Sequence, residues 1–69
     1  SMSQINRVFR QSTGTSLWDY VLRKRVISAH AMLERGEKAK NVCYACGFSD
    51  YSNFYRAYKA YFGHAPSRG

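Results

Sequence analysis

The stretch that most constrains the fold runs from Asn41 to Phe62 and reads NVCYACGFSDYSNFYRAYKAYF. Its hydrophobic spacing predicts a short apolar helix, a tight turn and a longer helix. Gly47 suits the positive φ of a helix end, and either Ser49 or Asp50 can cap the helix that follows. The three elements therefore form one compact unit, with the turn at its centre.

The longer helix has two different faces. One face is apolar and aromatic, at three- and four-residue spacing: Phe54, Ala57, Tyr58, Tyr61 and Phe62. The other face, together with the helix start, is mostly polar or basic: Tyr51, Ser52, Asn53, Tyr55, Arg56 and Lys59. We expect the first face to be buried and the second to be free for a partner. A short helix and a glycine-containing turn that precede a helix with one polar and basic face indicate a helix-turn-helix DNA-binding motif.

The remaining chain predicts further helices and no strand, because no alternating pattern occurs. Ser3 can cap a first helix over residues 3–12, and Ser16 opens a long helix over residues 16–35. The expected buried stripe of the long helix is Trp18, Leu22, Val26, Ala29 and Leu33. The short helix begins near Lys38, and Pro66 predicts the start of a last helix over residues 65–69. The fold class is all-α.

Charge and composition limit the classes of partner. The 69 residues suffice for one small domain, and eleven Lys and Arg against four Asp and Glu give a net charge of +7. Such a balance favours an anionic partner, most often nucleic acid, over a merely solvated basic surface. No apolar run approaches the roughly 18 residues of a membrane span, so we expect no membrane partner. Two cysteines without a disulfide-dense pattern fit a reducing compartment, so we expect a cytoplasmic location.

Two cysteines and two histidines raise the alternative of a zinc site. Cys43 and Cys46 form a C-x-x-C pair, but His30 and His64 stand far apart in the sequence. Buried cysteine behaves as a small apolar residue, which is the interpretation we favour here. A redox role would need a βαβ setting, and no Ser-His-Asp grouping or phosphate-binding glycine loop occurs. We expect no metal, no cofactor and no enzyme activity.

Two segments carry a resemblance to a known family. INRVFRQSTGTSLWDYVLRKR and VCYACGFSDYSNFYRAYKAYFGHAP together resemble the DNA-binding domain of the AraC/XylS family of bacterial transcription activators. The resemblance implies two helix-turn-helix units joined by a long central helix. Residues 3–12 would be the recognition helix of the first unit, 16–35 the central linker helix and 38–62 the complete second unit. Family domains are longer, so we expect the first unit to lack its N-terminal scaffold helices and the last helix to be clipped.

A first helix without its scaffold would expose apolar side chains. Ile5, Val8 and Phe9 would lose most of their burial, which is worth about 1.5–3 kcal/mol for each fully buried side chain. We therefore expect this helix to fray, to repack or to pair with a second copy in a homodimer.

The resemblance also implies roles for individual residues, with the recognition helices in the major groove of DNA. The base-reading residues would be Tyr51, Ser52, Asn53 and Arg56 in the second unit, and Asn6 and Arg7 in the first. The phosphate-binding residues would be Lys59, Tyr55, Ser3, Gln4 and Arg10. Arg56 suits guanine O6 and N7, whereas Asn53 suits adenine N6 and N7. Alternatively, Arg56 and Lys59 are solvated helix charges and the tyrosines only shield the helix. Arg25, on the central helix, is expected to be structural.

The leading hypothesis is sequence-specific binding of double-stranded DNA as part of a bacterial transcription regulator. RNA polymerase would be a further partner of the full-length protein. The alternative is a protein-interaction or self-association fragment that binds nucleic acid only nonspecifically. Base preference separates the two, because contacts to phosphate alone are indifferent to sequence and depend steeply on salt.

Overall fold

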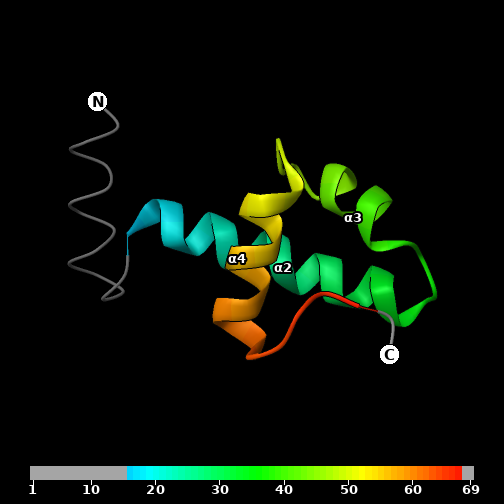
Figure 1. The fold of residues 1–69 in the computed structure, drawn as a ribbon. Helices are drawn as coiled ribbons and strands as arrows, with labels where there is room; N and C mark the ends of the chain where they lie inside the picture. The colour runs from blue at the N-terminus through cyan, green and yellow to red at the C-terminus, as the bar shows by residue number, and fades with distance from the viewer. Residues whose placement is uncertain (1–15, 68–69) are drawn as a thin grey trace.

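The computed structural model describes residues 16–67, which form three α-helices and no strand. Helix α2 spans Leu17–Glu34, α3 spans Ala39–Ala45 and α4 spans Tyr51–Phe62. Each helix packs on the other two, and α4 crosses α2 in Figure 1 while α3 lies beside the later part of α2. The all-α prediction is confirmed. The first helix, predicted over residues 3–12, lies outside the described residues.

Local side chains begin the two longer helices as the sequence predicted. The hydroxyl of Ser16 accepts a hydrogen bond from the backbone N–H of Asp19 at 3.0 Å. The carboxylate of Asp50 accepts one from the backbone N–H of Asn53 at 2.8 Å. Each bond satisfies an N–H group that the first turn of a helix leaves without a partner. Of the two candidate caps for α4, Asp50 is therefore the one that forms.

The turn between α3 and α4 depends on Gly47. Its φ is +96°, in the left-handed region that glycine enters without steric penalty. The N–H of Gly47 donates to the carbonyl of Tyr44 at 3.1 Å, and the N–H of Phe48 donates to that of Cys43 at 3.2 Å. This pair of bonds is the Schellman arrangement, which reverses the chain and points Phe48 into the core.

One hydrophobic core joins the three helices and the turn. Its buried members are Val26, Ala29, Leu33, Val42, Cys43, Phe48, Phe54 and Tyr58. The stripe expected on α2 is therefore correct for Val26, Ala29 and Leu33. It is wrong for Trp18, which is 57% exposed, because no described element packs over the first turn of α2. The apolar face expected on α4 is wrong for Tyr61, which is 49% exposed at the edge of that face.

The segment after α4 does not resume a helix within the described residues. The chain leaves α4 at Gly63 and runs back toward the C-terminal end of α2 (Figure 1). Residues 63–67 are non-helical, and Pro66 is buried. The helix expected to start at Ala65 and Pro66 is therefore not formed over residues 65–67. Residues 68–69 lie outside the described part.

None of the three described helices combines the length and the apolar composition that a bilayer crossing requires.

Candidate nucleic-acid interface

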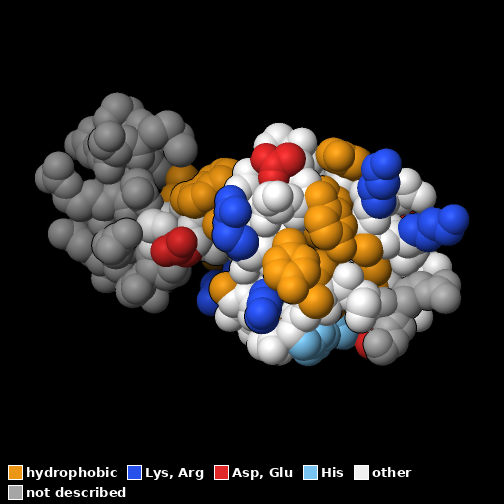
Figure 2. All heavy atoms as spheres, in the orientation of Figure 1, with side chains coloured by type: hydrophobic (Ala, Val, Ile, Leu, Met, Phe, Trp, Pro, Cys, Tyr) orange, Lys and Arg blue, Asp and Glu red, His pale blue; other side chains and the backbone are white. Residues whose placement is uncertain are grey.

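The outer face of α4 carries all the predicted contact residues of the second unit. The side chains that reach solvent from this helix include Tyr51, Ser52, Asn53, Tyr55, Arg56 and Lys59. Behind them Phe54 and Tyr58 are fully buried, so the inner side of the same helix is anchored in the core. Basic and aromatic side chains lie among one another over the face that carries α4 (Figure 2). The structure thus places these six residues on the exposed part of one helix.

Three polar side chains on this surface form a chain of hydrogen bonds. The carboxylate of Asp50 accepts a bond from the side-chain amide of Asn53 at 3.0 Å, in addition to its backbone cap. The guanidinium of Arg56 donates to the amide oxygen of Asn53. The bonds link positions three residues apart, which are neighbours on a helix surface. The sequence pattern D-x-x-N-x-x-R was the available signal for these hydrogen bonds, whereas the capping role predicted for Asp50 accounts only for its bond to the backbone.

Two exposed side chains at the later end of the surface also lie close together. The ammonium group of Lys59 is 5.9 Å from the centre of the Tyr55 ring, within the range of a cation–π contact. Both side chains remain exposed. Neither group is withdrawn from a partner that approaches α4.

Arg25 packs against the turn that leads into α4. Its guanidinium carbon lies 5.3 Å from the ring centre of Trp18 and 5.7 Å from that of Phe48. A Cβ atom at Gly47 would lie 3.3 Å from the same guanidinium carbon. Arg25 therefore supports the turn directly, in agreement with a structural role. A cleft of about 480 Å³ lies beside it, lined in part by Asn53 and Arg56.

The cysteines belong to the core beneath this surface. Cys43 is fully buried, and its thiol donates a weak hydrogen bond to the backbone carbonyl of Asp50 at 3.6 Å. Burial raises the pKa of the Cys43 thiol, and the carboxylate of Asp50 raises it further. The sulfur of Cys46 lies 3.8 Å from that of Met32. Within residues 16–67, no three potential metal-binding side chains gather in one place.

The residues expected to contact DNA from the first unit are not part of the described structure. These residues are Ser3, Gln4, Asn6, Arg7 and Arg10. The expected pairing of the first helix with a second copy also falls outside the described residues. The described part of the candidate interface therefore consists of α4 and the turn before it.

Comparison with known proteins identifies the family. Residues 1–68 match the family described as "Helix-turn-helix domain". The Msm operon regulatory protein of Streptococcus mutans is 35% identical over 69 residues, which cover 99% of this chain and 25% of that protein. The transcriptional regulatory protein HptR of Staphylococcus aureus is 33% identical over 67 residues, covering 97% and 27%. The HTH-type transcriptional activator RhaS of Escherichia coli is 30% identical over 67 residues, covering 96% and 24%.

The chain spans about a quarter of the length of these relatives. No solved structure matches it with significant similarity. The family match covers nearly the whole chain, and the described helices have the order that a helix-turn-helix unit on a long helix requires. The chain belongs to the helix-turn-helix domains of the AraC type.

Proposed function

We propose that this chain is the DNA-binding part of a transcription regulator and that α4 reads base pairs in the major groove of double-stranded DNA. The family match and the regulatory relatives support DNA binding. The net charge of +7 supports a polyanionic partner. A chromosomal target implies a cytoplasmic location.

The observation that carries the proposal is the division of α4 into a buried side and a polar outer side. Phe54 and Tyr58 anchor the helix from behind, while its outer side chains stay exposed. The major groove is about 12 Å wide, which admits one α-helix with its side chains. Helix α4 can therefore enter the groove without any change in the core.

Each outer side chain then has a role that follows from its chemistry. The guanidinium of Arg56 matches guanine O6 and N7, while Tyr51 and Ser52 at the helix start lie beside neighbouring bases. Lys59 and Tyr55, near the later end of the surface, meet phosphate groups and fix the register without reading sequence. In the first unit, Asn6 and Arg7 would read bases in the next major groove, about 34 Å away. Ser3, Gln4 and Arg10 would contact the backbone there.

The test is selection from a pool of randomised DNA duplexes at physiological salt, with the wild-type chain and with Arg56→Ala. We expect the wild type to enrich a short motif and the variant to lose its preference at one or two positions of that motif. Arg35→Ala is the matched control, because Arg35 is exposed at the far end of α2 and paired with Glu37. Equal enrichment of all sequences by the wild type would contradict the proposal.

The second candidate function is protein interaction, either self-association or contact with RNA polymerase in the full-length protein. It is favoured by large aromatic side chains that remain exposed, Trp18 at 57% and Tyr44 at 53%. This function predicts concentration-dependent association in sedimentation experiments, together with DNA binding that is indifferent to sequence. Both measurements use the same preparation, so one experiment series separates the two candidates.

A further inference from the structure

Asp50, Asn53 and Arg56 stand three residues apart, from the N-cap of α4 to its middle, and all three are exposed. The carboxylate of Asp50 bonds the backbone N–H of Asn53 at 2.8 Å and its side-chain amide nitrogen at 3.0 Å. The amide oxygen of Asn53 in turn accepts a bond from the guanidinium of Arg56. A single chain of bonds thus runs from the helix cap to the arginine.

The amide of Asn53 is therefore engaged at both of its ends. To contact adenine in the bidentate manner, an asparagine must present its amide oxygen and its amide nitrogen side by side to the base. In Asn53 the nitrogen is directed to Asp50 and the oxygen to Arg56. Turning the amide toward a base would break both bonds. The geometry disfavours the adenine contact that the sequence suggested for this residue.

Arg56 is in the opposite situation. A guanidinium group carries five N–H donors in one plane, and the bond to Asn53 uses one of them. The remaining donors still include a pair that can bond to two acceptors at once. The bond to Asn53 already restricts the long, exposed side chain of Arg56 in the free protein. Less conformational entropy is therefore lost when Arg56 binds DNA. Arg56 is thus held ready for a base with two adjacent acceptors, which in the major groove is guanine.

We propose that Asp50 and Asn53 are positioning residues that orient Arg56, and that Arg56 alone gives the second unit a preference for guanine at one base pair. This inference rests on the proposed function, because it assigns the base that α4 reads. Asp50 acts through Asn53 and touches no base. Its carboxylate performs two tasks, because it also caps α4.

Two substitutions break the chain of bonds and leave Arg56 in place. Asn53→Ala removes the bridge. Asp50→Asn preserves the cap, since asparagine is as good a capping residue as aspartate. The new amide nitrogen is a donor, however, and cannot accept a bond from the donor of Asn53. The amide of Asn53 must then reverse, which turns its nitrogen toward Arg56 and removes the acceptor.

The experiment first uses Arg56→Ala to find the base pair at which preference is lost. Duplexes with each of the four bases at that pair are then titrated with the wild type, Asn53→Ala, Asp50→Asn and the double variant. Asn41→Ala is the control, because it removes an exposed amide on α3, outside this chain of bonds. We expect each single variant to lower the preference for guanine about three- to tenfold, a part of what one bidentate contact provides. Binding to a random duplex should change less than twofold.

The double variant should lose no more preference than Asn53→Ala alone, since Asp50 acts through Asn53. Circular dichroism verifies that each variant remains helical, so a loss of folding is separated from a loss of orientation. Asn53→Ala could instead lose an adenine preference at a neighbouring base pair and keep the guanine preference. That result would overturn this inference and leave the proposed function intact. The inference would also be overturned if Asn53→Ala and Asp50→Asn both kept the wild-type preference for guanine. A wild type without any base preference would overturn the proposed function and this inference together.

Discussion

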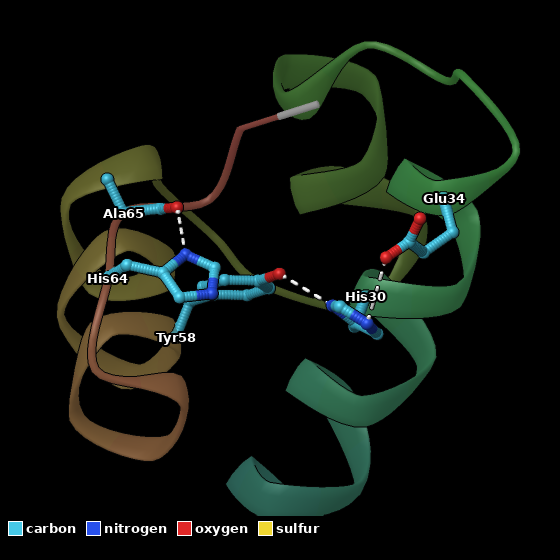
Figure 3. A network of polar contacts seen from close by, with 5 residues as sticks. All are labelled: His30, Glu34, Tyr58, His64 and Ala65. Atoms are coloured by element: carbon cyan, nitrogen blue, oxygen red, sulfur yellow. Dashed lines mark hydrogen bonds and ion pairs between the residues drawn. The ribbon is translucent and has the colours of Figure 1, made fainter. Parts of the chain in front are cut away.

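The Nδ1 atom of His30 lies 2.9 Å from the hydroxyl oxygen of Tyr58, and this hydrogen bond joins α2 to α4 (Figure 3). On the other side of the ring, His30 Nε2 lies 3.3 Å from a carboxylate oxygen of Glu34. The ring also stacks on Phe62, with 4.7 Å between the ring centres. Because Tyr58 is buried directly behind the outer face of α4, this contact helps to set the angle at which that face is presented.

Tyr58→Phe removes the hydroxyl group and keeps the ring. We expect the free energy of unfolding to fall by about 1 kcal/mol, the usual net value of one hydrogen bond in a protein. Urea denaturation at neutral pH measures the difference. Tyr55→Phe is the control, because its hydroxyl belongs to an exposed side chain and should change stability by less than about 0.5 kcal/mol. Equal losses in the two variants would mean that the bond between Tyr58 and His30 adds nothing to stability.

Gly47→Ala tests the packing of the turn against Arg25. Gly36→Ala is its matched control, because Gly36 has a similar φ of +91° and no atom within 4 Å of the added Cβ. A left-handed conformation costs about 1–2 kcal/mol for a residue with a Cβ, so both variants should be destabilised. Gly47→Ala should lose more, since its Cβ would lie 3.3 Å from the guanidinium of Arg25. Thermal unfolding of both variants compares them, and a larger loss at Gly36 would contradict the supporting role of Arg25.

The buried thiol makes stability depend on pH in the alkaline range. The pKa of Cys43 is raised above its ordinary value of 9.0 by burial and by the carboxylate of Asp50. The folded protein therefore holds this proton more tightly than the unfolded chain does. The resulting stability is fully present below the ordinary thiol pKa and is lost as pH rises through the higher folded value. Denaturation between pH 7 and about pH 10.5 should show a decline that begins near the ordinary thiol pKa.

Cys43→Ala separates this effect from the other alkaline titrations. The variant is less stable at every pH, because it leaves a small gap in the core. Its stability should nevertheless decline less between neutral and alkaline pH. The phenol of Tyr58, whose pKa is also raised by burial, accounts for part of the decline that remains. A variant with the full wild-type slope would show that the thiol is not the responsible group.

Lys59→Ala tests the division between phosphate contacts and base contacts. We expect weaker binding to all duplexes by a similar factor, and a decrease of about 1 in the slope of log affinity against log salt. The base preference should remain that of the wild type. Lys40→Ala, which removes an exposed charge from α3, should leave the slope closer to that of the wild type. A change of base preference in Lys59→Ala would mean that Lys59 contacts bases and not phosphate groups.

The sequence by itself determined the features that depend on neighbours within one helical turn. The start of α2 at Ser16 and of α4 at Asp50 could be predicted, because a capping side chain bonds an N–H group three residues later. The turn at Gly47 could be predicted because a helix end requires a positive φ. The polar outer face of α4 followed from helical periodicity alone. The family resemblance then supplied the candidate DNA-contacting residues.

The tertiary structure decided which parts of each predicted face are covered. Trp18 continues the apolar stripe of α2 and Tyr61 that of α4, yet both are largely exposed, because burial requires a second element at that place. The bond between His30 and Tyr58 joins residues 28 positions apart, and no local pattern marks such a pair. Arg25 reaches the turn for the same reason: the packing of α2 against that turn brings it there. Periodicity specifies the direction of a side chain from its own helix, whereas its partner depends on how the helices pack.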